Sequence, residues 1–552
     1  MDASIIVAGA GPVGTSLAID AALRGVSVIV LEARGAEDPA DAKCNTVAAR
    51  TMETFRRFGI ADQVRAAGLP DDYPTDTIYA TSLAGPEITR IRLPARSELG
   101  QPGYADSSWS TPERMVRLSQ LYLEPILRRR LLSLPNVRLM DHTEFVSYQQ
   151  DDSGVTVTAR STKTGEEKSL RCAYLAGCDG GRSAVRKQMG VKLVGDTEIS
   201  RTRSSLIRSS DIRKLFGKRR PAWMSWIVSH NVRGTVIAIN GDDLWLIHRS
   251  LRVGEPNFDT LDADQSLRDA LGVGKDFKYE IIKHEDWIGR RLVAERFREN
   301  RVFIAGDAAH LWVPFAGYGM NAGIADAMNL SWLLCSVING WASPAVIDAY
   351  EAERLPITDQ VSRYAMKKMQ ENIAAVGGGS PPKMLSARGP VGWAIRRKLG
   401  KKLHAINVPQ MAPEGLNYGY YYTGSPIIAH EAEAAPAYDM GTFTPSTVPG
   451  CRVPHFEVAG ASILDLLGPD YTLIRFNKLI DVEPLESAAR KAGVPIKLVD
   501  AAKPPIDAIA HNLLIVRSDQ HIVWRGQKAP DDTASLIQTL KGAGAANDRA
   551  AA

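Results

Sequence analysis

The sequence has few cysteines, and their arrangement would neither bind a metal nor cross-link a small domain. The five are Cys44, Cys172, Cys178, Cys335 and Cys451, and no two of them form a C-x-x-C pair. This scatter argues against a zinc site and a disulfide framework, and it favours a reducing compartment. We therefore expect a cytoplasmic protein with no metal ligands.

Long apolar runs and a strong excess of one charge are also absent. No stretch approaches the roughly 18 uninterrupted apolar residues of a membrane-spanning helix. The N-terminus opens into an apolar strand, without the basic segment of a signal peptide. The 67 basic and 62 acidic residues leave a net charge of +5, a mild excess that does not indicate nucleic acid. The sequence thus predicts neither a membrane nor a nucleic-acid partner.

What the sequence does contain is length and apolar residues. At 552 residues, the chain is long enough for two or three domains. Its hydrophobic content of 45% and charged content of 23% are typical of a globular protein with an ample core.

The clearest motif lies near the N-terminus. The segment "SIIVAGAGPVGTSLAIDAALRGVSVIVLEA" predicts a buried strand at 5–8, a helix, and a second strand at 26–31. Glycines 9, 11 and 14 form G-x-G-x-x-G at the first turn, where a bare backbone and the helix N-terminus can receive a pyrophosphate. Glu32 follows the second strand and can accept ribose hydroxyl hydrogen bonds. This context predicts a dinucleotide site.

A second segment helps to choose between NAD and FAD. In "RVFIAGDAAH", Gly306 and Asp307 end another apolar strand about 300 residues downstream. An NAD domain of the usual size has no need for it, whereas the ribityl chain and ring of FAD extend well beyond the first unit. Asp307 could therefore bind a ribityl hydroxyl, and the bare "GYGMNAG" that follows lets a helix N-terminus approach the flavin. Taken alone, Asp307 could also be a helix cap or a solvated turn.

A third segment, "YLAGCDGGRSAVRKQMG", adds an Asp-Gly turn after another apolar strand. With it, the sequence resembles the class A flavoprotein monooxygenases, the family of p-hydroxybenzoate hydroxylase and phenol hydroxylase. That family carries the three motifs in the same order. They are Gly9-Gly11-Gly14, Asp179-Gly180 with Ser183 and Arg186, and Gly306-Asp307. The resemblance covers residues 1 to about 375, and a further likeness continues to about 545.

The resemblance implies bound FAD, with NADPH or NADH as co-substrate. Arg50 and Gln120 match family residues that contact FAD, although alone each fits a helix surface, and Arg117 is a second basic candidate. The family loop P-P-x-G-G-x-G-x-N is altered at 313–321, where one proline and one glycine are missing. The expected FAD-binding residues are Gly9, Gly11, Pro12, Gly14, Glu32, Ala33, Arg50, Arg117, Gln120, Asp179, Gly180, Gly306, Asp307, Pro314, Gly317, Gly319, Met320 and Asn321.

We expect an α/β fold in several parts. A Rossmann-like FAD-binding domain would comprise residues 1–75, 111–187 and 292–375, and an inserted mixed β-sheet substrate domain would comprise 76–110 and 188–291. A helix or linker at 376–405 leads to 406–547, which resembles the thioredoxin-like C-terminal domain of the phenol hydroxylase branch, and 548–552 form a tail. Because this last domain lacks C-x-x-C, we expect it to serve in packing or dimer contact.

The resemblance implies an aromatic hydroxylase that uses NAD(P)H and O₂ through a C4a-hydroperoxyflavin. Its substrate would be a small phenolic compound, with or without chloro or nitro groups, from the degradation of aromatic compounds. The family resemblance also implies a homodimer. A base or acceptor should face the substrate hydroxyl. Spacing does not identify it, and the candidates are His248, Tyr318, Asp106 and Asn45.

Two alternatives stay open. The same fold supports oxygenation of polycyclic, polyketide or drug substrates, which a phenol hydroxylase-like C-terminal domain does not exclude. The chain could instead be an FAD-binding regulator that does not turn over. A simple NAD-dependent dehydrogenase is excluded more firmly, because it would purify without flavin.

Overall fold

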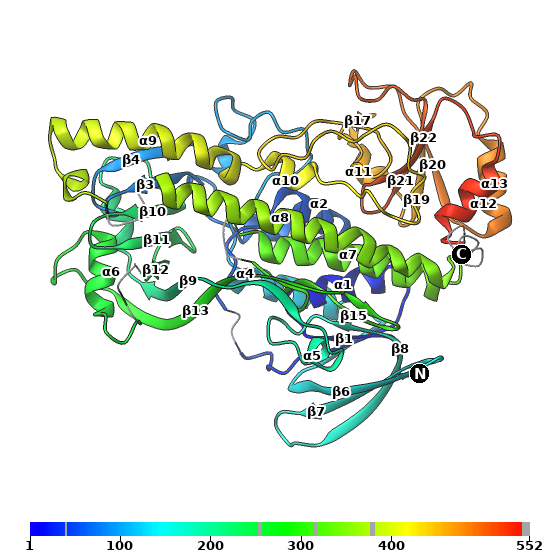
Figure 1. Cartoon of the computed structure of the whole chain (residues 1–552), viewed down its shortest axis with the longest axis horizontal. Coiled ribbons are helices and arrows are strands. Elements are labelled where there is room, and N and C mark those ends of the chain that lie inside the picture. Colours follow the sequence, from blue (N-terminus) through cyan, green and yellow to red (C-terminus); the bar gives the residue numbers. More distant parts are fainter. Residues whose placement is uncertain (39–40, 252–254, 256, 313–316, 376–380, 544–552) are drawn as a thin grey trace.

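The computed structural model of the chain describes residues 1–38, 41–251, 255, 257–312, 317–375 and 381–543. Pro314 of the expected flavin loop lies outside these residues. Figure 1 shows long helices above a central sheet, a second large sheet at one end of the molecule, and a small sheet at the other end. The predicted α/β class is confirmed.

The first sheet is built on five parallel strands. In spatial order they are β15 (Val302–Ile304), β8 (Glu167–Gly177), β1 (Ala3–Ala8), β2 (Val28–Leu31) and β5 (Val137–Met140). Strand β14 (Arg298–Glu299) closes one edge, and the hairpin of β6 (Thr143–Asp151) and β7 (Gly154–Ser161) extends from β8. Because parallel strands end on one edge of a sheet, the turns after β1, β2, β8 and β15 lie together.

Helices cover this sheet, because strands that are apolar on both faces need a layer on each. Helix α1 (Pro12–Leu23) packs against α7 (Tyr318–Ile338) and α4 (Gln120–Leu132), and α8 (Asp348–Ala375) packs on α7. Nearly all of α1 is buried, which explains why its sequence is apolar on every side. The shorter helices are α2 (Ala49–Phe58), α3 (Ala61–Ala66) and α5 (Ala184–Gln188).

The second sheet is mixed, as predicted. Its order is β16-β13-β9-β12-β11-β10-β3-β4, and β10 pairs with β3 in parallel while the other neighbours are antiparallel. The strands are β3 (Thr77–Ala80), β4 (Glu87–Ile91), β9 (Leu193–Arg208), β10 (Met224–Val228), β11 (Arg233–Ala238), β12 (Leu244–Ser250), β13 (Glu280–Ala294) and β16 (His310–Leu311). Helix α6 (Ala263–Leu271) contacts β11 and β12, and α9 (Pro390–Met411) packs on β4.

The C-terminal sheet has the order β20-β19-β21-β22. Strands β19 (Tyr471–Arg475) and β20 (Ile496–Asp500) are parallel and are joined through α12 (Glu483–Ala492), whereas β21 (Leu513–Arg517) and β22 (Ile522–Gly526) form an antiparallel hairpin before α13 (Thr533–Leu540). This βαβ unit followed by a hairpin and a helix suits the expected thioredoxin-like arrangement. The segment between α9 and this sheet contains α10 (Glu414–Tyr418), β17 (Glu457–Val458), β18 (Ala461–Ser462) and α11 (Ile463–Leu466). The domain boundaries themselves stay a prediction.

The second strand differs from expectation for a local reason, and a glycine fixes the start of α7. The second strand begins at Val28, two residues late, because the Val26 N–H bonds back to Ala21 in the turn that ends α1. Helix α7 begins at Tyr318, directly after Gly317, whose φ of +71° lets the chain turn into the helix. Among the described residues, no helix is both long and apolar enough to cross a membrane.

Candidate active site

The glycine-rich turn after β1 is closed toward the sheet and open on its other side. A Cβ on Gly14 would lie 2.0 Å from the Gly9 carbonyl oxygen, and one on Gly9 would lie 2.5 Å from that of Cys178. Gly11 differs, because a Cβ there would meet nothing within 4 Å. Pro12 starts α1, where a missing N–H leaves no helix bond unmade. The turn therefore leaves room for a ligand at Gly11.

A chain of contacts joins this turn to the start of α4. Glu32 accepts a hydrogen bond from the Ala10 N–H at 2.8 Å and from the Arg34 N–H at 3.0 Å. Arg34 reaches Glu124 at 3.3 Å, and Glu124 accepts from the Gln120 amide at 2.6 Å. This chain of contacts thus joins Glu32 to Gln120, although they are 88 positions apart in the sequence.

The Asp-Gly turn after β8 uses one side of its carboxylate to build the fold. Asp179 Oδ2 accepts from the N–H groups of Ala184 (2.7 Å) and Val185 (3.2 Å), at the start of α5. Its Oδ1 is buried and has no hydrogen-bond partner among the described residues. Gly180 has a φ of +76° and open space around its Cα. This turn presents an acceptor and a bare backbone to the same edge.

Arg186 ties the two acidic turns together. Its guanidinium donates to the carbonyl oxygens of Gly181 at 3.0 Å and Ala308 at 2.9 Å. Ser183 accepts from the Arg186 N–H at 2.9 Å and caps α5. Burial lowers the pKa of Arg186. The Ser and Arg of the family motif therefore fix the turns rather than face a ligand.

Asp307 follows β15 at the carboxyl edge of the first sheet. Its side chain is exposed, while its neighbours Gly306 and Ala308 are buried. Partial desolvation by nearby protein atoms raises the pKa of its carboxyl group, against the opposing charges of His310 and Lys43. No described residue donates a hydrogen bond to it. Asp307 is thus available to a ligand hydroxyl.

A buried cluster holds the strand end beneath Asp307. Asp326 accepts from the Gly306 N–H at 3.3 Å and from Arg354 Nε at 2.8 Å, and it lies 2.7 Å from His310 Nε2. Burial opposes ionisation of Asp326, but Arg354 and His310 hold its pKa below the usual value. Sequence reasoning missed this cluster, because its members come from β16, α7 and α8.

Asn321 clamps the loop that precedes α2 to the start of α7. Its Oδ1 accepts from the Ala48 N–H at 2.8 Å, and its Nδ2 donates to the carbonyls of Thr46 (3.0 Å) and Gly317 (2.9 Å). Next to it, Gly319 has open space around its Cα. The amide of Asn321 is fully used by protein, so its contribution to a site is to hold the loops in place.

Arg117 is the buried cation beside this clamp. Its Nη1 donates to Thr46 Oγ1 at 2.9 Å, and its guanidinium lies 3.9 Å from the centre of the Trp223 ring. Burial lowers the pKa of Arg117 to about 10, although Tyr318 and Asp106 act in the other direction. Three of the four candidates for receiving the substrate hydroxyl, namely Tyr318, Asp106 and Asn45, therefore lie near Arg117. Asn45 is included because it adjoins Thr46.

These three differ in what they offer. Asn45 Oδ1 is buried without a partner among the described residues. The Tyr318 hydroxyl accepts from the Asn417 amide at 3.2 Å, and burial raises its pKa. Burial also raises the pKa of Asp106, against Arg114. Asn417 is a residue that sequence reasoning missed, although it lies in the tyrosine-rich segment before the C-terminal sheet.

His248 is placed on the mixed sheet, away from those contacts. Its Nδ1 lies 2.7 Å from Ser204 Oγ, which also accepts from Trp287 Nε1 at 2.7 Å. The His248 and Trp287 rings meet edge to face. Burial lowers the pKa of His248 to about 4, so the ring is neutral at physiological pH.

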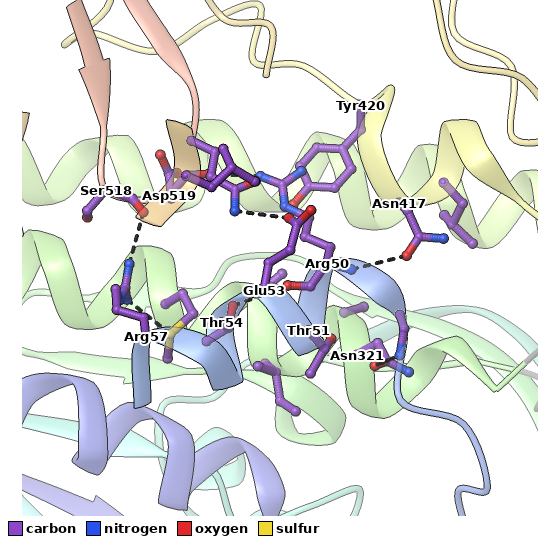
Figure 2. A pocket seen from close by; sticks show the side chains of 18 of the residues that line it. Arg50, Thr51, Glu53, Thr54, Arg57, Asn321, Asn417, Tyr420, Ser518 and Asp519 are labelled. Atoms are coloured by element: carbon purple, nitrogen blue, oxygen red, sulfur yellow. Dashed lines mark hydrogen bonds between the residues drawn. The ribbon is translucent and has the colours of Figure 1, made fainter. Parts of the chain in front are cut away.

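Arg50 faces the C-terminal part of the chain. It lines a cavity of about 250 Å³ between α2, α7, α8 and the β21–β22 turn, shown in Figure 2. Its Nη2 donates to the Asp519 carbonyl oxygen at 2.9 Å, and its guanidinium lies 4.4 Å from the centre of the Tyr420 ring. Two more α2 side chains hold the same turn, because Arg57 donates to the Ser518 carbonyl at 2.9 Å and Glu53 accepts from Gln520.

The remaining predicted positions are on the same edge as the turns. Ala33 follows Glu32, and its carbonyl accepts from Thr162 at 3.2 Å. Met320 lies in the first turn of α7. Among the described residues, no group of His, Cys, Asp and Glu side chains is arranged to hold a metal ion.

We call the edge of the first sheet that carries Gly11, Glu32, Asp179, Gly180 and Asp307 the ligand edge. Its free polar groups fit FAD chemically. Its unpartnered oxygens, Asn45 Oδ1 and Asp179 Oδ1, are acceptors, and Asp307 is an uncommitted carboxylate. They would meet ring N–H and ribityl hydroxyl donors, while open glycines 11 and 180 would meet a pyrophosphate. The fold and this edge define a flavin-dependent enzyme of the class A aromatic hydroxylases.

Comparison with known proteins agrees with this class. Residues 2–365 match the family described as "FAD binding domain", and the chain belongs to this family. An FAD-dependent monooxygenase of Emericella nidulans is 30% identical over 95% of this chain and 87% of its own. Phenol 2-monooxygenase of a Pseudomonas species is 27% identical over 98% of this chain and 93% of its own. The structure of chromopyrrolic acid-soaked RebC with bound 7-carboxy-K252c has a TM-score of 0.88 and 31% identity, covering 98% of this chain and 99% of that one.

Proposed function

We propose that the chain hydroxylates a phenolic ring with NAD(P)H and O₂, as its FAD-dependent class does, in the degradation of aromatic compounds. The observation that carries this proposal is the ligand edge, where groups around the parallel strand ends are left without protein partners while those behind them are saturated. FAD, when bound, accepts electrons from NAD(P)H and passes an oxygen atom from O₂ to the substrate. A cytoplasmic location belongs to the same proposal, because the five cysteines are scattered without a C-x-x-C pair.

The cofactor-binding roles follow from position. Gly9, Gly11 and Gly14 would cradle the pyrophosphate, Glu32 would bind the adenosine ribose, and Asp307 would bind the ribityl chain. The backbone at Gly317, Gly319 and Met320, with the N-terminus of α7, would face the flavin ring. The other predicted contacts are those of Pro12, Ala33, Arg50, Arg117, Gln120, Asp179, Gly180, Gly306, Pro314 and Asn321. For Arg50, the observed partners are in the C-terminal part of the chain, so a cofactor contact rests on the family likeness alone.

The phenol hydroxyl would be received by His248. In the tautomer whose Nδ1 donates to Ser204, Nε2 is a hydrogen-bond acceptor, and the lowered pKa keeps the ring neutral. Trp287 supplies an aromatic wall beside it. Tyr318, Asp106 and Asn45 are second candidates, because they gather near Arg117 and burial raises the pKa of both Tyr318 and Asp106.

The test is oxygen uptake with NADPH, and separately NADH, across substituted phenols, with each product identified by mass. The proposal expects phenol-stimulated uptake and the gain of one oxygen atom. In the same assay, His248→Gln should lower kcat/KM while FAD content stays constant. Uptake that no phenol stimulates would contradict the proposal.

A second candidate is oxygenation of a larger substrate, because the solved structure of RebC carries 7-carboxy-K252c rather than a simple phenol. Including polycyclic phenols and polyketide-like quinols in the panel separates the two candidates. Bound FAD with no stimulated uptake by any compound would favour a non-turnover role. A homodimer also stays a prediction, which light scattering would test.

A further inference from the structure

One segment outside the ligand edge concentrates positive charge. Between Glu371 and Glu414 the sequence has no Asp or Glu, yet it has seven basic residues: Lys383, Arg388, Arg396, Arg397, Lys398, Lys401 and Lys402. In the described part of the chain, none of the seven forms a salt bridge with an acid. The net charge of the whole chain is only +5. The excess is therefore local and not spread evenly, which a chain-wide count does not reveal.

Most of these residues lie on one exposed face of α9. Positions 393, 397 and 401 are spaced by one turn, and 391, 398 and 402 lie beside them, so all six share a face. All six are exposed. The opposite face is buried on β4, where a Cβ on Gly400 would lie 2.4 Å from the Ile88 carbonyl oxygen. Contact with the sheet thus fixes which face is turned outward.

The first turn of this face is apolar and exposed. Val391 is 60% exposed and Trp393 is 56% exposed, and Met384 just before the helix is 48% exposed. The Arg397 guanidinium lies 5.1 Å from the Trp393 ring. Figure 1 shows α9 at the end of the molecule opposite the C-terminal sheet. Exposed apolar side chains at the start of α9 are thus followed by exposed basic side chains along the same face.

We propose that this face of α9 docks on an anionic lipid bilayer. The Trp393 ring, Val391 and Met384 would enter the headgroup–acyl boundary, where amphipathic aromatic rings are favoured. The lysines and arginines of the next two turns would lie over the lipid phosphates, with their apolar stems along the interface. The protein would bind the surface without crossing the bilayer.

The charge pattern distinguishes this partner from two others. A two-fold contact between copies would set the basic faces against each other, since the same patch is used twice, and like charges would repel. A nucleic acid would bind the lysines through phosphates but would leave Val391 and Met384 exposed. A bilayer satisfies both the basic side chains and the exposed apolar ones.

The experiment is sedimentation of the FAD-loaded protein with vesicles of phosphatidylcholine alone or with phosphatidylglycerol at 30 mol% (roughly the anionic content that gives a strong surface potential). We expect binding to the anionic vesicles only, weakened by salt. Neutralising one basic residue near the surface lowers affinity about fivefold, so K398Q/K401Q/K402Q should bind on the order of 100-fold more weakly. Trp393→Ser should weaken binding at both low and high salt.

The matched control is K163Q/K168Q/K491Q, which neutralises three exposed lysines on other elements and should bind like the parent. NADPH oxidation should be unchanged in every variant, because α9 contributes no group to the ligand edge. Binding that is equal on both vesicle types, or equal in both triple variants, would overturn the proposal. Binding to a DNA duplex without vesicle binding, or a Trp393-dependent dimer without it, would also overturn it and identify the other partner.

Discussion

The ligand edge and the contact with the C-terminal hairpin are both rich in polar groups. They differ in how many of those groups have hydrogen-bond partners within the protein. At the edge, Asp307 and one oxygen of Asp179 have no partner in the described chain. At the hairpin, Arg517 donates to both oxygens of Glu353, at 2.6 and 2.9 Å, and its Nε donates to Asp519 at 3.1 Å. Groups that the fold saturates hold the protein together, whereas groups that it leaves unpaired await a ligand.

The difference predicts opposite outcomes of mutation. Breaking a saturated group should lower stability and leave cofactor affinity unchanged in the folded fraction. Breaking an open group should lower cofactor affinity and leave the stability of the cofactor-free protein unchanged.

The largest effect is expected at Arg517, which is fully buried. Arg517→Met leaves Glu353 buried without its charged partner, which should lower the free energy of unfolding by about 3–5 kcal/mol. Urea unfolding of the cofactor-free protein measures it. The control is Arg160→Met, whose exposed pair with Glu144 should contribute about 1 kcal/mol at most. Similar losses in both variants would contradict the saturated character of the hairpin contact.

The next effect is loss of cofactor at Asp307. Asp307→Ala should purify almost colourless and bind FAD about 10- to 100-fold more weakly, because a charge-assisted hydrogen bond contributes about 1.5–3 kcal/mol. Circular dichroism should show the parent fold. Absorbance of bound flavin against protein gives the occupancy. If the variant keeps full occupancy, the role assigned to Asp307 is wrong.

The glycine turn offers both outcomes within four residues. Gly14→Ala places a Cβ 2.0 Å from a carbonyl oxygen and should lower stability by about 1–3 kcal/mol. Gly11→Ala meets no protein atom within 4 Å and has a φ of −66° that alanine accepts. It should unfold like the parent and bind FAD more weakly. Thermal unfolding and FAD titration of the two variants test the pair, and equal destabilisation would break the distinction.

The smallest effect is a pH dependence at the hairpin. Burial lowers the pKa of His521 to about 3, although Asp519 acts in the other direction. A depressed histidine pKa gives stability that is fully present above the unfolded pKa of about 6.5 and is lost as pH falls toward 3. The loss should be about 1.4 kcal/mol per pH unit, and His521→Asn should reduce the slope between pH 6.5 and 5. An unchanged slope would assign the pH dependence of stability to other buried histidines such as His248.

Much of the fold could be predicted because its signals are local. The strands before Gly9, Asp179 and Gly306 are continuous apolar runs, and each is followed by residues that only a turn accommodates. The pairing of α2 with the β21–β22 turn could not be predicted, because Arg50 and Asp519 are 469 residues apart.

The candidate site divides along the same line. Sequence placed each acidic turn directly after an apolar strand, and the parallel sheet brings these turns to one edge. It could not assign Arg117 to Trp223 and Thr46, nor Asn417 to Tyr318, because these contacts join elements from different parts of the chain. It also gave Asn321 as a cofactor residue without revealing that its amide is used entirely by protein.

The sequence by itself determined which residues could form the strands, the bare turns and the family to which the chain belongs, because backbone conformation and hydrophobic burial follow short-range patterns. Only the tertiary structure decided which polar groups are paired and which stay open. Pairing depends on where distant side chains meet in a low-dielectric interior, and the same aspartate is a structural cap when N–H groups reach it and a ligand site when none do.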